Sequence, residues 1–356
     1  MAGRKTVGLD IGTSGVRAAE LSVARGTVTL ERFGQVALPP GAVRDGEVAD
    51  PDSVAEAIKR LWSSGKFSTK RVTLGVANQR VIVRQVDLPW MPLDELRRSL
   101  GMLVQDVLPI PVEQAILDFH PVEEFVSDSG ARTLRVLLVA AAREMVLSSL
   151  NAVEKAGLTL TQVDLTPFAV LRALVDVDHL SLGEQQTEAL VDVGARVTNI
   201  IVHQNGVPRF VRILMMGGEH LTEAVAERLG VPLEQAETVK QQLGMSPVAG
   251  ALPSEHPGAR VLESAASALV EEIRGSLDYY LAQPAAVPLG RLRVSGGGAR
   301  LTNFSDRLAA GCRLPVDRAG TFSRLQVGKT GLTPEQLSYV EPVAAVPVGL
   351  AMGVAS

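Results

Sequence analysis

The sequence predicts an α/β protein made of two similar halves, with a small α+β unit inserted into the first half. Three observations support this prediction. A strand–turn–strand motif occurs twice, strand and helix patterns alternate along most of the chain, and one segment interrupts the alternation. The first motif, TVGLDIGTSGVRAAEL, spans residues 6–21, and the second, ALVDVGARVTNIIVH, spans residues 189–203.

The two motifs match position by position. Asp10 falls on Asp192, and Gly12 falls on Gly194, so both the acid and the turn glycine recur. Each copy reads as a strand that ends in a carboxylate, a tight turn, and a returning strand. One such hairpin is common, but a repeated acid and glycine in register favour a duplicated functional unit.

Composition and charge exclude several classes of protein. The chain has 356 residues, of which 46% are hydrophobic and 21% charged, enough for two folded domains. A net charge of −4 provides no overall field for nucleic acid, so no nucleic-acid partner is expected. The single cysteine, Cys312, excludes an intramolecular disulfide. With no signal peptide and no run of about 18 apolar residues, we expect a soluble, cytoplasmic protein.

The first half reads as strands followed by a helix. Alternation predicts a third strand at residues 27–38, and a helical apolar face predicts a helix over residues 52–61, capped by Asp52. Two further strands are expected at residues 71–77 and 81–88. This order of elements is typical of an α/β domain.

A proline-bounded segment then interrupts the pattern. Apolar residues at three-to-four spacing predict a helix from Asp94 that ends at Pro109 and Pro111. Two strands and a second helix are expected at residues 116–122, 133–141 and 144–155. We interpret residues 86–158 as a small α+β subdomain inserted into the first domain.

The second half repeats the pattern of the first. A strand ends near Asp164, and Pro167 suits the start of a helix of small apolar residues. After the second motif come helices at residues 220–228, 233–243, 265–281 and 302–310, a surface loop at 246–257 and a strand at 291–295. The tail, residues 343–354, resembles residues 168–175 in composition, and such helices pack closely where two domains cross.

The first turn has residue types that suit phosphate. Backbone N–H groups and the hydroxyls of Thr13 and Ser14 can point at phosphate oxygens, and Arg17 can neutralise their charge. Asp10 can hold a water on Mg²⁺, an ion that keeps several waters. An ordinary β-hairpin is the alternative for one copy. The second copy favours a clamp that holds a phosphate chain from both sides.

Three other segments are candidates for binding. The glycines of residues 295–298 (SGGG) let backbone approach a flat base or sugar, although flexible turns have the same composition. Residues 216–218 (MGG) leave a helix N-terminus open to an anion. Glu237 and Lys240 share a helix face and either contact ribose and base or form an exposed ion pair, which the spacing alone favours.

The DIG-turn hairpin of the first motif, its VDVG repeat and the late GGG resemble the actin/hexokinase/Hsp70 nucleotide-binding superfamily. The segment LPWMPLDELRRSLGMLVQDVLPIPVEQAILDFHPVEE is similar to the FtsA/PilM branch, and within it to the type IV pilus assembly proteins of the PilM family. Five further segments resemble the same family in order: GLDIGTSGVRAAEL, DVGARVTNIIVHQNGVPRFVRILMMGGEHLTEAVAERLG, AETVK, RGSLDYY and VSGGGARLTNF. The resemblance runs from Val7 to about Gly353. It implies a duplicated actin-like (ribonuclease H-like) two-domain nucleotide-binding fold with an inserted α+β subdomain in the first domain.

The resemblance also implies four subdomains and the residues of a nucleotide site. The expected subdomains are 1A (1–85 and 159–183), the inserted 1C (86–158), 2A (184–228 and 290–356) and 2B (229–289). Phosphate-1 positions match Asp10, Gly12, Thr13, Ser14 and Arg17; phosphate-2 positions match Asp192, Gly194 and Thr198; adenosine-side positions match Gly218, Glu237, Lys240, Gly297 and Gly298. ATP is the implied nucleotide, with Mg²⁺ held through water by Asp10 and Asp192.

This sequence departs from the family at three positions. Arg17 stands where the family often has lysine, and Arg196 and Val197 replace small residues of the second turn. Asp164 is the one candidate for a catalytic residue that activates water. We therefore expect ATP binding with slow turnover or none.

Family resemblance implies partners as well. PilM-like proteins sit on the cytoplasmic face of the inner membrane and bind the short cytoplasmic N-terminus of the bitopic protein PilN, in a groove that involves the inserted subdomain. With PilN and PilO they connect the pilus motor ATPases to the assembly platform; self-association stays open. An FtsA-like division protein is the alternative, although AVPVGLAMGVAS lacks the amphipathic tail it would need. A small-molecule kinase would need a catalytic acid beside a substrate pocket.

Overall fold

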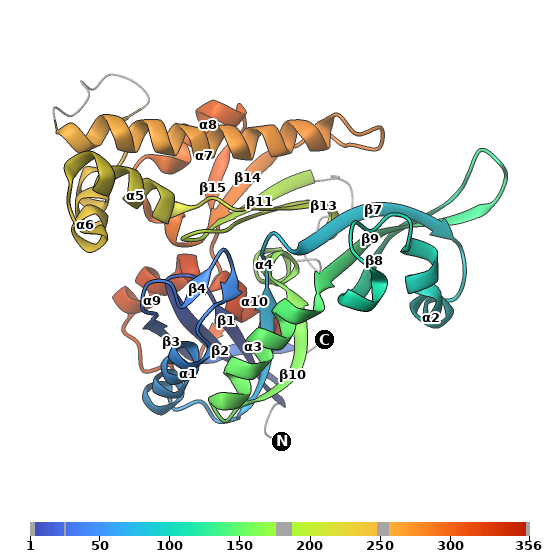
Figure 1. Ribbon diagram of the computed structural model, residues 1–356, viewed down its shortest axis with the longest axis horizontal. Helices are drawn as coiled ribbons and strands as arrows, with labels where there is room; N and C mark the ends of the chain where they lie inside the picture. Colours follow the sequence, from blue (N-terminus) through green and yellow to red (C-terminus); the bar gives the residue numbers. More distant parts are fainter. Residues whose placement is uncertain (1–3, 25, 176–186, 248–255, 354–356) are drawn as a thin grey trace.

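Two β-sheets, one in each domain, have five strands in equivalent order, and the first sheet has a sixth strand from the C-terminal part of the chain (Figure 1). The computed structural model describes residues 4–24, 26–175, 187–247 and 256–353. The first sheet has the order β10 (Thr159–Leu165), β6 (Arg71–Val76), β1 (Arg4–Ile11), β2 (Gly15–Ala24), β3 (Thr27–Ala37) and β16 (Gln326–Val327). The second has the order β13 (Val207–Leu214), β12 (Thr198–Gln204), β11 (Thr187–Val193), β14 (Arg291–Ser295) and β15 (Val316–Arg318).

Strand pairing confirms the duplication. β1 pairs antiparallel with β2 and parallel with β6, and β11 pairs antiparallel with β12 and parallel with β14. In each sheet the third strand, β3 or β13, pairs antiparallel with the second. The acid of each motif therefore lies at the carboxyl end of a central strand, where ligands bind in sheets with parallel strands.

Helix α1 (Pro51–Gly65) covers the first sheet, and its cap differs from the prediction. Val54, Ile58 and Leu61 are buried, as its apolar face predicts. The cap is Asp50, whose side chain accepts N–H groups two and three residues on, so the assignment to Asp52 is wrong. Proline 51 explains the earlier start, since its fixed φ and missing N–H suit the first helical position. A short hairpin precedes the helix, formed by β4 (Val43–Arg44) and β5 (Glu47–Val48).

Two helices of small residues cross at the centre, as predicted. α4 (Thr166–Leu174) packs against α10 (Ala345–Met352), and both contribute to the largest hydrophobic core. A Cβ added to Gly349 would lie 1.7 Å from the carbonyl oxygen of Ala169, and one added to Gly8 would lie 2.0 Å from that of Pro347. The crossing therefore depends on glycine, because backbone touches backbone.

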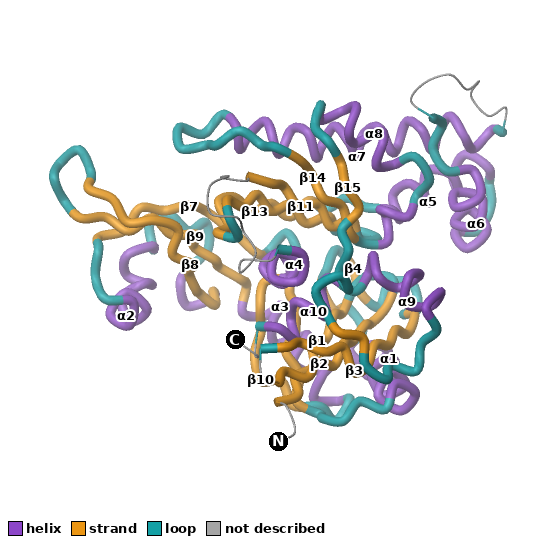
Figure 2. The backbone as a smooth tube through the Cα atoms, turned by 180° about the vertical axis from the view of Figure 1, so that it is seen from behind, coloured by secondary structure: helices purple, strands orange, loops and turns teal. Residues whose placement is uncertain are grey.

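Helices of the second half lie on the outer side of its sheet (Figures 1 and 2). They are α5 (Gly218–Leu229), α6 (Leu233–Leu243), α7 (Pro257–Leu281) and α8 (Phe304–Cys312). α6 packs on α5 and α7 at one end of the domain. α7 begins eight residues before the predicted start because the His256 ring accepts the N–H of Gly258 and caps it. Part of the predicted 246–257 loop lies outside the described residues. α9 (Pro334–Val340) follows β16 along the chain. The 3₁₀ turn η2 (Gly297–Arg300) follows β14, and the 3₁₀ turn η3 (Glu341–Val343) lies between α9 and α10.

The inserted unit is a separate three-stranded sheet that projects from the first domain (Figure 1). Its strands, in the order β7 (Val81–Pro89), β9 (Arg132–Ala142) and β8 (Ala115–Val126), pack on α2 (Leu93–Val104) around a core of their own, and η1 (Val112–Gln114) precedes β8. α2 ends five residues before Pro109, so the predicted proline stop is wrong.

The boundaries of the inserted unit follow from these pairings. All of β7 belongs to the inserted sheet, whereas α3 (Arg143–Lys155) packs against α1 and β10 of the first domain. We therefore propose residues 78–142 for this unit, in place of 86–158. The expected 183/184 boundary between subdomains lies outside the described residues. None of the described helices combines the length and apolar character that a membrane span requires.

Candidate functional site

A cavity of about 1000 Å³ separates the two domains, and the turns of both motifs line it. The predicted binding residues on its wall are Asp10, Gly12, Thr13, Ser14, Arg17, Asp192, Gly194, Gly218, Glu237, Lys240, Gly297 and Gly298. The structure thus brings together residues that are distributed over almost the whole chain. Thr198 and Asp164 are the exceptions.

The two turns have the same internal hydrogen bond. The N–H of Gly12 donates to the carbonyl of Gly15 over 3.0 Å, and the N–H of Gly194 donates to that of Val197 over 2.9 Å. A Cβ at Gly194 would lie 2.6 Å from the Val197 oxygen, so this turn requires glycine. The equivalence extends from sequence to hydrogen bonding, which supports two copies of one ligand-binding device.

Arg17 spans the first turn. Its Nη1 donates to Oδ2 of Asp10 over 3.2 Å and its Nη2 to Oγ of Ser14 over 3.3 Å. The side chain is 18% exposed, so the guanidinium charge is held at the cavity wall with little freedom. A planar guanidinium with several N–H donors suits phosphate oxygens in this position.

Two largely buried carboxyl groups face the cavity. Burial raises the pKa of Asp192 to about 6; the Oγ of Ser295, which donates over 2.8 Å, opposes this rise, and the charge of Asp10 adds to it. Burial also raises the pKa of Asp10, against the opposing charge of Arg17. Two carboxylates that share only one nearby cation, Arg17, suit a divalent cation that arrives with a polyanion.

The pKa of Asp192 makes stability depend on pH. The folded-state value of about 6 lies above the ordinary 3.8, so between these values the folded protein binds more protons than the unfolded chain. Its free energy of unfolding should therefore fall as pH rises from about 4 to 6. The full difference is about 3 kcal/mol, and Asp192→Asn should recover part of it at pH 7 without nucleotide or Mg²⁺.

Urea denaturation of both proteins at pH 4 and pH 7 measures this effect. The asparagine variant should be more stable than wild type at pH 7 and not at pH 4. Asp50→Asn is a control of opposite sign, because hydrogen bonds from Ser53 lower the pKa of Asp50. Equal stabilities of wild type and the Asp192 variant at pH 7 would contradict the assignment.

The N-terminus of α5 is closed by the second turn. The N–H of Gly218 donates to the carbonyl of Gly194 over 2.9 Å, and the N–H of Glu219 donates to that of Ala195 over 2.8 Å. The hypothesis that residues 216–218 leave free N–H groups for an anion is therefore wrong. These groups instead attach the helix to the turn.

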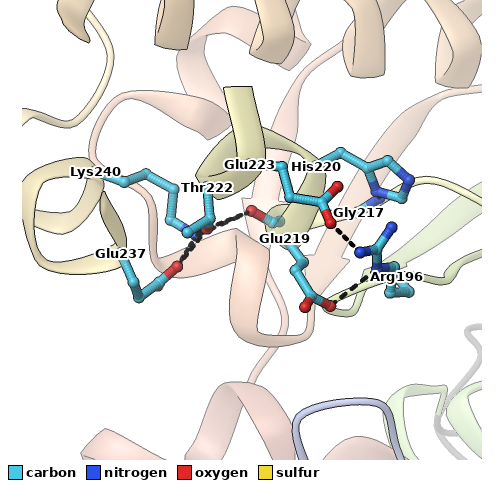
Figure 3. Close-up of polar contacts among 9 residues, drawn as sticks. Arg196, Gly217, Glu219, His220, Thr222, Glu223, Glu237 and Lys240 are labelled. Atoms are coloured by element: carbon cyan, nitrogen blue, oxygen red, sulfur yellow. Dashed lines mark hydrogen bonds and ion pairs between the residues drawn. The ribbon is translucent and has the colours of Figure 1, made fainter. Parts of the chain in front are cut away.

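Charged side chains reinforce this attachment (Figure 3). Arg196 Nε donates to Glu219 over 3.1 Å, and its Nη2 also pairs with Glu223. Gly217 allows the close approach, since a Cβ there would lie 2.5 Å from the Gly194 oxygen. The arginine that replaces a small residue in the second turn thus fixes the turn to α5.

The side chains of Glu237 and Lys240 form a hydrogen-bonded network next to α5 (Figure 3). Lys240 Nζ lies 3.0 Å from the carbonyl of Gly218, 2.9 Å from Thr222 Oγ1 and 2.6 Å from Glu237 Oε2. Gln241 donates to the other Glu237 oxygen over 2.8 Å. Burial opposes ionisation of Glu237, but hydrogen bonds from Lys240 and Thr222 outweigh it and lower the pKa. The ion pair favoured by spacing is therefore present, but only its glutamate is exposed: the Glu237 side chain is 39% exposed, whereas Lys240 is buried.

The three glycines of η2 and its cap have different surroundings. A Cβ at Gly296, whose φ is +86°, would lie 2.3 Å from the Val193 carbonyl oxygen, and one at Gly298 would lie 2.3 Å from Val193 Cγ1. The nearest heavy atom to a Cβ at Gly297 is Val343 Cγ1, at 3.9 Å. Two of the glycines therefore serve packing on β11, and Gly297 is the one with open space toward the cavity.

Two predicted residues lie away from the cavity wall. Thr198 is fully buried and donates its hydroxyl to the carbonyl of Met216 over 2.7 Å. Asp164 pairs with Arg172 and accepts the N–H of Leu165 over 2.7 Å. Thr166, at the start of α4, lines the cavity instead. Its position was not predicted, although the proline after it marks the same helix start.

Sequence reasoning also missed Arg300 and Tyr339, which line the cavity from η2 and α9. The guanidinium carbon of Arg300 lies 4.2 Å from the centroid of the Tyr339 ring. Arg300 lies two residues after Gly298, the last of these glycines, which is a signal that could have identified it. Tyr339 lies 39 residues further along the chain and has no local motif.

Comparisons relate the chain to known proteins. A family model described as type IV pilus assembly protein PilM matches residues 8–354. A solved PilM–PilN type IV pilus biogenesis complex is similar over 99% of this chain and 98% of that chain, with a TM-score of 0.86 and 26% identity. EutJ of Carboxydothermus hydrogenoformans (TM-score 0.55, 17% identity, 98% and 89% covered) and ADP-bound MreB5 of Spiroplasma citri (0.53, 14%, 97% and 94%) share the fold.

Curated relatives include cell division proteins. FtsA of Bacillus subtilis is 26% identical over 67% of this chain and 58% of its own length. FtsA of Neisseria meningitidis is 27% identical over 85% of this chain and 77% of its own length. The chain thus spans less than two thirds of the Bacillus subtilis relative.

Proposed function

The chain belongs to the family of type IV pilus assembly protein PilM, and from this premise we propose that it is an ATP-binding, actin-like scaffold of the pilus inner-membrane assembly platform. The observation that carries the proposal is the meeting of two equivalent acid–glycine turns across one cavity. Each turn can contact a different part of a phosphate chain. A solved protein of the same fold, MreB5, is bound to ADP, which supports a nucleotide as the ligand.

Magnesium is the cation that fits these residues. Asp10 and Asp192 provide two largely buried carboxylates and would hold Mg²⁺ through its water molecules. The ion would neutralise part of the negative charge of these carboxylates and of the phosphates. Arg17 lies beside Asp10 and adds a fixed positive charge for the phosphate chain.

Slow turnover fits the residues at the start of α4. Asp164, the expected water-activating residue, pairs with Arg172 away from the cavity wall. Thr166, which does line the cavity, has a hydroxyl that does not accept a proton at neutral pH. We therefore propose that ATP acts mainly as a bound effector.

The partner we propose is the cytoplasmic N-terminal segment of a PilN-like bitopic protein, bound at the inserted unit. That unit has exposed apolar side chains suited to a peptide, namely Trp90, Leu93, Met102, Val107, Ile116 and Val126. Through this partner the protein would sit at the inner face of the cell membrane, with a PilO-like protein and the pilus motor ATPases connected indirectly. The PilM–PilN complex among the similar structures supports the choice of partner.

An ion-pair network connects the inserted unit to the second domain. Glu123 on β8 accepts from Arg209 on β13 over 3.3 Å and from Arg135 on β9 over 2.6 Å. Arg135 also contacts both oxygens of Asp87 on β7, over 2.7 and 3.0 Å. A nucleotide that changes the angle between the domains would change the distances within these ion pairs. Partner binding would then respond to ATP.

Replacing Glu123 by glutamine should weaken that response. In wild type we expect Mg–ATP to change the affinity for the PilN-like N-terminal peptide by about fivefold or more, within the usual range of allosteric coupling. In Glu123→Gln the change should shrink, because the amide loses the charge that holds Arg209 and Arg135 together. Fluorescence anisotropy of a labelled peptide with and without Mg–ATP measures both affinities.

The neighbouring Glu124 provides a matched control. It pairs with Arg132 inside the inserted unit over 3.2 Å and makes no contact with the second domain among the described interactions. Glu124→Gln should respond to ATP as wild type does. Wild-type peptide binding that is independent of ATP would contradict nucleotide modulation, and a full response in Glu123→Gln would contradict this route.

A further inference from the structure

Residues of α6 and α9 line one part of the cavity wall. Leu233 and Gln241 of α6 line it from the second domain, and Tyr339 of α9 lines it from the C-terminal segment, with Arg300 of η2 on the same wall. Figures 1 and 2 both place α6 and α9 on the same side of the molecule, away from the inserted unit. A nucleotide whose phosphates lie at the two turns could reach this part of the wall with its nucleoside.

The Lys240 donors expected to bind the nucleoside are already used. Lys240 Nζ has three partners, Gly218, Thr222 and Glu237, which equals its number of N–H donors. Glu237 in turn accepts from Lys240 and Thr222 at one carboxylate oxygen and from Gln241 at the other. A ribose or base would have to break a bond of Lys240 to use one of its N–H groups, so this lysine is better suited to shape the wall than to hold the ligand.

Tyr339 offers a different kind of contact. Its side chain is 62% exposed although it lines the cavity, whereas the other aromatic side chain on the cavity wall within the described residues, Phe304, is 1% exposed. The Arg300 guanidinium carbon lies 4.2 Å from the ring centroid and covers one face of the ring. Arg300 also donates to the backbone carbonyl of Tyr339, which fixes the guanidinium in place.

We propose that the Tyr339 ring, backed by Arg300, is the surface on which the nucleobase stacks. This inference rests on the proposed nucleotide binding and extends it to a specific contact. A flat purine ring would cover the exposed face of Tyr339 and remove that apolar surface from water. The guanidinium on the opposite face holds the ring in a fixed orientation, so little side-chain entropy is lost when the base binds.

Removing the ring separates base binding from phosphate binding. Tyr339→Ala should weaken ATP binding about tenfold, the usual scale for the loss of one base–aromatic stack. Inorganic tripolyphosphate, which has no base, should bind equally to wild type and variant. Tyr339→Phe should bind ATP like wild type, since it keeps the ring. Isothermal titration in Mg²⁺ measures all three proteins against both ligands.

The design controls for structural damage. Arg300 bonds the carbonyl of residue 339, which alanine retains, and Tyr279→Ala on α7 removes an equally exposed tyrosine (59%) that does not line the cavity. Unchanged ATP affinity in Tyr339→Ala would overturn the stacking proposal alone, as would an equal loss of tripolyphosphate binding. Failure of wild type to bind ATP or tripolyphosphate would overturn the proposed function, and the stacking proposal with it.

Discussion

Alanine at position 349 should destabilise the protein more than any other substitution considered for this chain. The added Cβ would lie 1.7 Å from the carbonyl oxygen and 2.4 Å from the carbonyl carbon of Ala169. Both are backbone atoms of α4, so relief requires moving α10 away from α4 within the largest core. We expect a loss of at least about 3 kcal/mol in the free energy of unfolding, the upper range for overpacked cores.

Gly275→Ala is the matched control for this experiment. Gly275 lies inside helix α7 and a Cβ there would meet no heavy atom within 4 Å, so alanine should raise stability by about 0.5–1 kcal/mol. Urea denaturation followed by circular dichroism measures both variants. Wild-type stability of Gly349→Ala would contradict the close crossing of α4 and α10.

The second large expected effect is a loss of nucleotide affinity in a variant that still folds. Gly297→Ala places a methyl group in open space toward the cavity, 3.9 Å from its nearest neighbour, Val343. The free protein should therefore fold normally. A nucleotide in van der Waals contact with this glycine would clash with the methyl group, at about 1–3 kcal/mol for such overpacking, or about 5- to 150-fold in affinity.

Gly298→Ala separates the two roles within the same segment. Its Cβ would lie 2.3 Å from Val193 Cγ1, inside the protein, so the free energy of unfolding of this variant should fall. Isothermal titration calorimetry measures the ATP affinity of both variants, and urea denaturation measures their free energies of unfolding. Normal ATP affinity in Gly297→Ala would place the ligand elsewhere in the cavity.

Much of the site was predictable from sequence because its signals are local. The acid and glycine of each motif lie two residues apart, and strand alternation places them at the end of a strand. That local pattern correctly placed Asp10 and Asp192 on one cavity. It could not show that Asp164 faces Arg172, because the partner of a side chain depends on how α4 packs on β10.

The duplicated fold and the two turns could be predicted from the sequence, since periodicity and turn chemistry act over a few residues. How the polar groups around the cavity are used depends on tertiary packing. It directs the first N–H groups of α5 to the second turn and buries Lys240 in a closed network. It also brings Tyr339 to Arg300 from 39 residues away, through β16, which returns the chain to the first sheet. Contacts between distant segments depend on packing, and packing has no local signature.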